Sequence, residues 1–174
     1  MSKTLIVYYS RKGENYWNGS IRNLAKGNTE TVAEMIADIT GGDLFEVDTV
    51  KTYPEDYYAC IDEAKEELRR KDRPEAKAYK DDLEEYDTIY VGLPNWWGDM
   101  PMILYTFLDT YDLSGKTVAP FNTSGGSGFS GSLDTIAEME PDAEITEGLS
   151  LGSDEAEDSA DAVAEWLSSI GLVE

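Results

Sequence analysis

The feature that most constrains the fold is an alternation between short, β-prone apolar segments and longer segments with helical periodicity. The strongest strand-like segments are residues 3–9 (KTLIVYY), 87–92 (DTIYVG) and 116–121 (KTVAPF). Two weaker segments cover residues 43–48 and 144–149. Short runs rich in Val, Ile, Thr and aromatic residues are typical of strands that are buried on both faces of a sheet.

Helical patterns follow these segments. Apolar residues recur at helical spacing in residues 32–39, 104–111 and 163–170, and residues 54–70 and 130–139 are also expected to be helical. Strands that alternate with helices form βα units, in which the strands are parallel and the helices cover both faces of the sheet. The sequence therefore predicts an α/β fold of three layers with a five-stranded parallel sheet.

The chain of 174 residues is expected to form a single domain across residues 1–174, because this length can bury one core and no change of composition divides it. No apolar run approaches the roughly 20 residues needed to span a membrane, and the apolar stretch near the start is too short for a secretory signal. The single cysteine, Cys60, fits a reducing compartment. We therefore expect a cytoplasmic protein, although a secreted protein with few cysteines would look the same.

The charge of the chain excludes some partners and the lack of histidine excludes some chemistry. Its 36 acidic and 14 basic residues give a net charge of −22, which argues against nucleic acid and anionic membranes and favours partners with basic surfaces. High solubility or a salt-adapted host would explain the same charge. With no histidine, the usual general base and most zinc sites are missing, so chemistry must come mainly from carboxylates, Tyr, Lys or a bound cofactor.

The loop after the first predicted strand is a candidate anion site. Ser10, Arg11 and Lys12 follow the strand directly, and Asn28 and Thr29 stand where the first helix begins. Hydroxyl groups and the free N–H groups of a helix N-terminus together suit an anion, most naturally a phosphate. Simple capping of the helix by Asn28 or Thr29 is the alternative. Arg11 and Lys12 favour the anion site, because basic residues are scarce in this chain.

The loop after the third predicted strand is a candidate platform for a planar ring. It contains the residues Pro94, Asn95, Trp96, Trp97 and Gly98. At least one indole is expected to lie outside the core, where its flat face suits a conjugated ring; the alternative is that one of the two tryptophans plugs the sheet edge. Gly98 lets the backbone approach a ligand closely, and Asn95 offers an amide for ring heteroatoms.

The loop after the fourth predicted strand is rich in glycine and serine. Its candidate binding residues are Thr123, Ser124, Gly125, Gly126, Gly128 and Phe129. Such a loop offers many backbone N–H and C=O groups at small steric cost, while a flexible linker is the alternative. In open α/β sheets ligands bind beyond the carboxyl ends of the strands. The three loops together predict a pocket for a phosphorylated, planar molecule with polar edges, which describes flavin mononucleotide (FMN).

These loops make the sequence resemble the flavodoxin family over nearly its whole length. The family's phosphate fingerprint, a hydroxyl residue and a Gly-Asn-Thr-like turn after the first strand, is similar to residues 10–13 followed by Asn28 and Thr29, with residues 14–27 inserted. The resemblance implies a flavodoxin-like three-layer sandwich with strand order 2-1-3-4-5. It also implies the short-chain form, because no long insertion interrupts the fifth strand.

The resemblance also implies how the ring is held. Residues 94–98 and 123–129 would contact the isoalloxazine from its two sides. Since the ring is typically held between aromatic residues in this family, Trp96 or Trp97 would stack on it together with Phe129 or Trp17. The inserted residues would form a hairpin or flap, whose Tyr16 and Trp17 are able to fold back over the ligand.

Two functions fit these features. The first is a low-potential electron carrier that docks redox partners with basic surfaces, because negative charge near the flavin disfavours its anionic reduced form. The alternative is an FMN-dependent NAD(P)H:quinone-type oxidoreductase, to which the anionic nicotinamide dinucleotide would be poorly attracted by a chain of net charge −22. The carrier is therefore favoured, and no catalytic residue or metal site is assigned. Cys60 is expected to be a packed thiol, because no histidine or basic neighbour is present to lower its pKa.

Overall fold

A single parallel sheet forms the centre of the protein. The computed structural model describes residues 3–17, 20–80, 83–124, 128–152 and 155–172. The sheet consists of β1 (Lys3–Tyr8), β4 (Asp43–Glu46), β5 (Tyr86–Pro94), β6 (Thr117–Ser124), β7 (Glu144–Ile145) and β8 (Leu149–Gly152). Its order is β4-β1-β5-β6-β7, with β8 also paired to β6, and these pairings are parallel. Because β7 and β8 share the fifth place, the predicted order 2-1-3-4-5 is confirmed.

The fifth strand is interrupted. The prediction of one continuous strand over residues 144–149 was therefore wrong for residues 146–148, which separate β7 from β8. β7 pairs with the start of β6 and β8 with its end. Between them the ring of Phe129 lies directly against Gly148, where a Cβ would stand 2.6 Å from the Phe129 Cζ. The ring occupies the space that a continuous strand with side chains would need.

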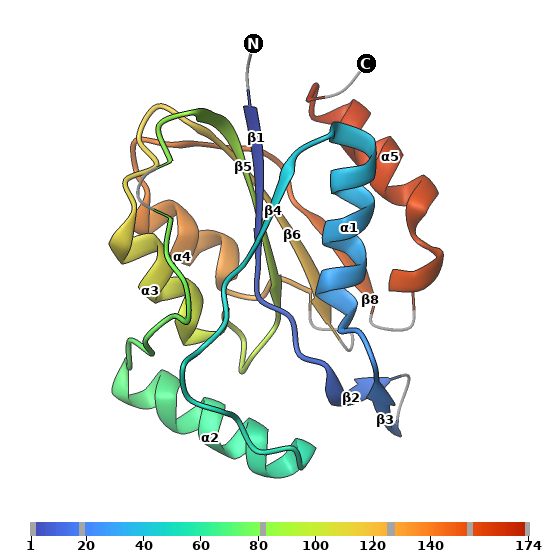
Figure 1. Ribbon diagram of the computed structural model, residues 1–174, viewed down its shortest axis with the longest axis vertical. Coiled ribbons are helices and arrows are strands. Elements are labelled where there is room, and N and C mark those ends of the chain that lie inside the picture. Colours follow the sequence, from blue (N-terminus) through green and yellow to red (C-terminus); the bar gives the residue numbers. More distant parts are fainter. Residues whose placement is uncertain (1–2, 18–19, 81–82, 125–127, 153–154, 173–174) are drawn as a thin grey trace.

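Two pairs of helices cover the two faces of the sheet. α1 (Asn28–Thr40) and α5 (Ala160–Ser169) lie on one face, and α3 (Met102–Thr110) and α4 (Ser132–Met139) lie on the other (Figure 1). A short 3-10 helix, η1 (Ala156–Asp158), leads into α5. These layers confirm the predicted three-layer α/β fold.

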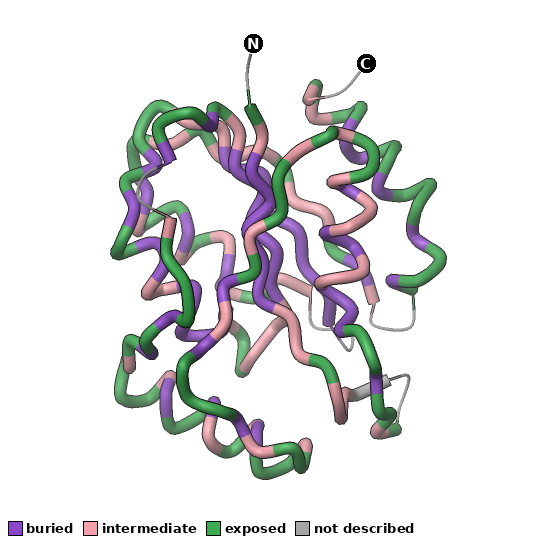
Figure 2. The backbone as a smooth tube through the Cα atoms, in the orientation of Figure 1, coloured by how far each residue is buried: buried purple, intermediate pink, exposed green. Residues whose placement is uncertain are grey.

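The alternation of side chains along the strands explains their continuous apolar sequences. In β5, Ile89, Val91 and Leu93 pack into the core on the α3 and α4 side, whereas Tyr90 packs into the core on the α1 and α5 side. Successive side chains of a strand point to opposite faces, and here both faces are buried. Figure 2 shows the buried strands as the centre of the molecule.

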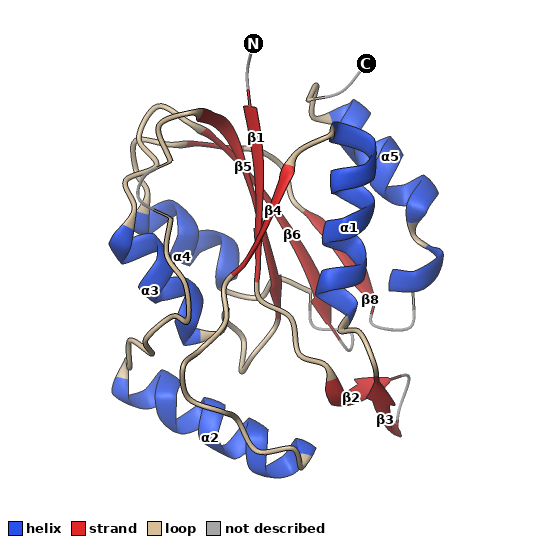
Figure 3. Cartoon of the chain, in the orientation of Figure 1, coloured by secondary structure: helices blue, strands red, loops and turns tan. Residues whose placement is uncertain are grey.

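Two elements lie outside the three layers, at the edge where the strands end. They are α2 (Tyr57–Arg70) and an antiparallel hairpin of β2 (Gly13–Trp17) and β3 (Ser20–Leu24) (Figure 3). The hairpin confirms the predicted form of the insertion, and α2 covers neither face of the sheet. Among the described residues, no helix is both long and apolar enough to cross a membrane.

The packing of Gly92 against Phe121 gives a test of the central register. The two residues are opposite each other in β5 and β6, and a Cβ at Gly92 would stand 2.2 Å from the Phe121 Cζ. We expect Gly92→Ala to lower the free energy of unfolding by about 1–3 kcal/mol, as overpacking usually does, measured by urea denaturation. The same change should cost much less in a Phe121→Leu background. Equal costs in both backgrounds would contradict this packing.

Candidate functional site

A cavity of about 450 Å³ lies at the carboxyl edge of the sheet, which is a usual volume for a small-molecule site. The loop after β1, the start of α1, α2, the loop after β5 and the end of β6 all contribute to it. The lining residues are Arg11, Asn15, Asn28, Thr29, Tyr57, Cys60, Ile61, Ala64, Pro94, Asn95, Trp96, Trp97, Gly98, Thr123 and Ser124. The cavity is therefore the candidate site.

The start of α1 is held closely against the loop after β1. The Ser10 hydroxyl accepts a hydrogen bond of 3.0 Å from the backbone N–H of Glu30, so Ser10 caps the helix. A Cβ at Gly27 would stand 2.1 Å from the Ser10 Oγ and 2.6 Å from the carbonyl oxygen of Arg11. Glycine alone allows this approach, and it brings the helix N-terminus to the edge of the sheet.

The first residues of α1 form a polar end of the cavity. Asn28 and Thr29 are both buried and both line it. The hydroxyl groups of Thr29 and Thr123 are 2.8 Å apart and hydrogen-bonded, which joins α1 to the end of β6. A pair of hydroxyls keeps further donor and acceptor capacity for a ligand. Since the first N–H groups of a helix lack intrahelical acceptors and carry partial positive charge, this end of the cavity suits an anionic group.

Arg11 connects two loops at the site. Its Nε donates to the carbonyl of Glu14 at 2.9 Å, and its Nη2 donates to the carbonyls of Pro54 at 3.1 Å and Glu55 at 3.0 Å. The guanidinium thus lines the cavity and also holds the segment that leads into α2. Lys12, the other basic residue predicted here, is exposed and is not among the lining residues.

Trp96 lies at the boundary between the cavity and the core. Its ring packs edge-on against Tyr9 and Tyr53, with centroid distances of 5.2 Å in both cases. Burial raises the pKa of both phenols, and a hydrogen bond to Glu67 raises that of Tyr53 further. Both tyrosines therefore stay protonated at neutral pH. Trp96 closes the sheet edge, as one of the two tryptophans was expected to do, and still lines the cavity.

Trp97 stands at the tip of a tight turn. Trp96 and Asp99 exchange two backbone hydrogen bonds of 2.8 and 3.3 Å, and the two residues between them have positive φ values, 59° at Trp97 and 80° at Gly98. Positive φ at both central positions is the arrangement of a type I′ turn. The turn leaves Trp97 46% exposed, and its indole N–H donates to the carbonyl of Ile61 in α2 at 2.6 Å.

Asn95 joins the two ring-binding loops predicted from the sequence. Its Nδ2 donates to the carbonyl of Gly128 at 2.8 Å and to the hydroxyl of Ser130 at 2.9 Å. Its Oδ1 accepts from the N–H of Gly98 at 2.9 Å. The amide that was expected to pair with ring heteroatoms is thus engaged in holding the loops together.

One helix of the site was not predicted to contribute to it. α2 lines the cavity with Cys60, Ile61 and Ala64, which we call the α2 wall. Cys60 is 2% exposed, and burial raises the pKa of its thiol, as fits a packed thiol. The one sequence signal was that small or charged residues, Cys60, Ala64 and Glu67, occupy the most buried positions of a helix. Asn15 in the hairpin and Tyr57 at the start of α2 were missed as well.

The predicted site residues fall into three groups. Those that the structure brings together around the cavity are Arg11, Asn28, Thr29, Pro94, Asn95, Trp96, Trp97, Gly98, Thr123 and Ser124. Those that are described but do not line it are Ser10, Lys12, Gly128 and Phe129. Gly125 and Gly126 lie outside the described residues, and so do the side chains of Tyr16 and Trp17.

Comparisons with known proteins agree with this architecture. The chain is similar to a protein of Bacteroides eggerthii described as a flavoprotein, with 30% identity over 100% of both chains and a TM-score of 0.78. It is similar to a protein of Bacteroides uniformis that carries the same description, with 30% identity over 96% of this chain and 98% of that chain and a TM-score of 0.78. A flavoprotein of Lactobacillus acidophilus, solved in complex with FMN, shares 26% identity over 94% of this chain and 99% of that one, with a TM-score of 0.64.

A comparison with curated proteins gave no match. A family model described as Flavodoxin matches residues 22–170, which is most of the chain. The sheet order, the position of the cavity and this match lead to one conclusion: the chain belongs to the flavodoxin family.

Proposed function

We propose that this protein binds FMN in the cavity and acts as an electron carrier. The observation that carries the proposal is that one cavity is lined both by the start of α1, which suits an anion, and by Trp96 and Trp97, which suit a planar ring. FMN has a phosphate at one end and a planar ring at the other. The FMN complex of the similar Lactobacillus acidophilus flavoprotein supports the same assignment.

The polar end fits a phosphate. The hydroxyls of Thr29 and Thr123 and the first N–H groups of α1 offer donors in a region that Gly27 holds closely against the loop after β1. Arg11, which also lines the cavity, adds a fixed positive charge. These groups would hold the phosphate.

The loop after β5 and the α2 wall fit a conjugated ring. Pro94 and the two tryptophans provide flat apolar surface, and the α2 wall adds the apolar side chains of Cys60, Ile61 and Ala64. Bound FMN would supply reversible transfer of one or two electrons. The residues of the chain would bind it, orient it and exclude water from it.

A carrier fits the site better than the alternative NAD(P)H:quinone-type oxidoreductase does. A nicotinamide must lie against the ring to pass a hydride to it, and α2 occupies one side of the cavity. The net charge of −22 also repels an anionic dinucleotide. The same charge favours redox partners with basic docking surfaces and a low potential, because it disfavours added negative charge on the flavin. The exposed ring of Trp97 is the feature that favours the oxidoreductase.

The first prediction separates these functions. Addition of FMN to the protein should shift the visible absorption bands of the flavin, because the ring leaves water for an aromatic site. Anaerobic stopped-flow mixing of the loaded protein with NADH or NADPH should then give little bleaching. Rapid bleaching would establish the oxidoreductase, and unshifted bands after mixing would contradict FMN binding.

The second prediction concerns the phosphate end. The double variant Thr29→Val with Arg11→Met should weaken FMN binding by roughly 10- to 100-fold, since hydrogen bonds to charged groups contribute about 1.5–3 kcal/mol. Riboflavin, which lacks the phosphate, should lose much less affinity. Both affinities can be measured by titration with flavin fluorescence.

The control for this prediction makes the same chemical changes away from the cavity. Thr40 lies at the other end of α1, where its hydroxyl donates to the carbonyl of Ile36, and Arg73 pairs with Asp109. The double variant Thr40→Val with Arg73→Met should bind both flavins as the unchanged protein does. Equal losses for FMN and riboflavin in the site variant would refute the phosphate assignment.

A further inference from the structure

Helix α2 is an unusual wall for a binding site. It lies outside the three layers, across the edge where the strands end (Figure 1). Its buried residues are Cys60, Ala64 and Glu67, which are small or charged. Burial of large aliphatic side chains is the usual means of fixing a helix, at roughly 1.5–3 kcal/mol each, and none of these three residues provides it.

Hydrogen bonds hold the first half of α2 to the site. The indole N–H of Trp97 donates to the carbonyl of Ile61 at 2.6 Å. The backbone N–H of Tyr57 donates to the carboxylate of Glu14 in the hairpin at 3.3 Å. The ammonium of Lys65 lies 5.1 Å from the centre of the Trp97 ring, at cation–π distance. Three contacts, two with Trp97 and one with Glu14, thus hold α2 to the loop after β5 and to the hairpin.

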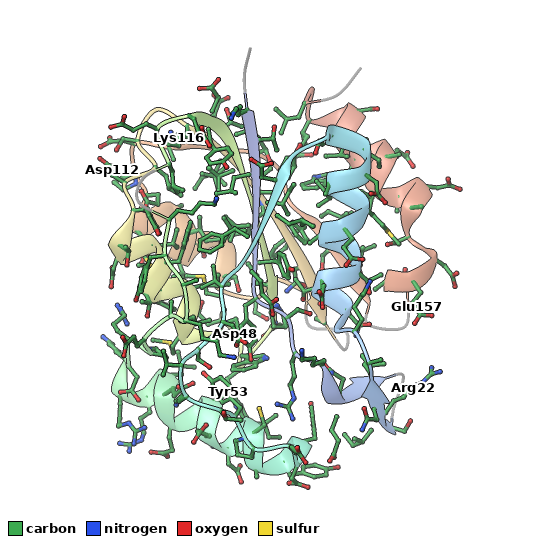
Figure 4. All side chains as sticks on the ribbon, viewed as in Figure 1. Arg22, Asp48, Tyr53, Asp112, Lys116 and Glu157 are labelled. Atoms are coloured by element: carbon green, nitrogen blue, oxygen red, sulfur yellow. The ribbon has the colours of Figure 1, made fainter. Side chains whose placement is uncertain are left out.

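The second half of α2 is anchored differently. Glu67 is fully buried, accepts a hydrogen bond of 2.6 Å from the Tyr53 hydroxyl and pairs with Lys51. Figure 4 shows Tyr53 beside the helix. Because an unpaired buried carboxylate is costly, this end resists separation. The second half of α2 is therefore held by a buried charged group at Glu67. The first half is held by hydrogen bonds at Tyr57 and Ile61.

The cavity has room for one ligand while α2 is in place. Its volume of about 450 Å³ lies in the lower half of the range of roughly 300–1,000 Å³ that sites for a single small molecule occupy. With FMN bound, a second ring is able to stack on the side of the α2 wall only after this helix has moved.

We propose that α2 is a movable wall latched by Trp97, and that the closed wall keeps nicotinamide dinucleotides off the flavin. Trp97 is then a positioning residue that determines specificity: it holds α2 over the ring, so that electrons are exchanged with partner proteins rather than with NADH or NADPH. The part that concerns the flavin rests on the function proposed above. The part that concerns the latch is independent of any ligand.

Cys60 makes the latch measurable without any activity. It is the single cysteine of the chain, it is buried and it lies on the cavity side of α2. A thiol reagent such as N-ethylmaleimide reaches it only when α2 opens or the protein unfolds. The rate of labelling, followed by mass spectrometry, therefore reports opening.

The test compares two tryptophan variants that lose the same kind of hydrogen bond. Trp97→Phe removes the indole N–H that donates to Ile61 but keeps an aromatic ring. Trp166→Phe is the matched control, because the Trp166 indole donates to the carbonyl of Glu147 at 3.0 Å from α5, on a face of the sheet and away from the cavity. We expect labelling of apo Trp97→Phe to be about fivefold faster than that of the unchanged protein, the effect of losing one hydrogen bond, and labelling of Trp166→Phe to be unchanged.

A second measurement uses the FMN-loaded proteins. Bound FMN should slow the labelling of Cys60 in all three proteins, and NADPH should bleach the flavin about fivefold faster in Trp97→Phe than in the other two. The two fivefold increases, in the labelling rate and in the bleaching rate, are expected to be equal because both rates depend on the fraction of molecules in which α2 is open.

Four outcomes would count against the latch, against its role in specificity or against the proposed function. Labelling of Trp97→Phe at the unchanged rate would overturn the latch, and equal acceleration in Trp166→Phe would attribute the effect to general destabilisation and overturn it too. Faster labelling without faster bleaching would overturn the role in specificity. Failure of all three proteins to bind FMN would instead count against the proposed function, while the labelling of the apo proteins would still decide whether α2 is latched.

Discussion

The parallel pairing of β1, β5 and β6 fixes where a site can form in this protein. Tyr8 is opposite Gly92, and Gly92 is opposite Phe121, so the three strands end at one edge and their loops begin side by side. The Phe121 ring lies over the Cα of Gly92, in space that any side chain would fill. A shift of β6 by one residue would place this ring against Val91 or Leu93 and would turn its side chains to the opposite face. The register that packs the core thus also aligns the loops.

The start of α1 depends on the same alignment. Thr29 reaches the Thr123 hydroxyl because β6 ends beside β5 and the helix N-terminus lies against the loop after β1. The close approach at Gly27 determines how far the helix can advance. Groups of the polar site thus also stabilise the fold. Ser10, which was predicted to bind the ligand, accepts a hydrogen bond from the start of α1 and so caps the helix.

The sequence predicted the layers and much of the cavity because the signals for these are local, whereas the strand order came only from the resemblance to the flavodoxin family. Runs of β-branched residues mark strands, and the polar loops that follow them share one edge by topology alone. The place of α2 was not predictable in this way. Its charge pattern indicates a helix, but Trp97 holds it, and Arg11 holds the segment before it, through backbone carbonyls, which every residue has. The partners of the Asn95 amide and the break in the fifth strand at Gly148 likewise depend on residues far apart in the chain.

The composition of the α2 wall follows from competing demands on a surface that closes a ligand site. Large aliphatic residues at positions 60 and 64 would bind α2 firmly to the core, but they would fill the cavity that the ligand needs. The small side chains of Cys60 and Ala64 leave that space open, but they contribute less hydrophobic stabilisation to the position of α2. Hydrogen bonds from Trp97 and Glu14 restore the position of the helix with defined geometry, and each contributes only about 1 kcal/mol because water replaces it when the helix moves. A wall held in this way is well placed when closed and opens at a small cost in free energy, whereas the buried pair of Glu67 and Lys51 keeps its other end attached.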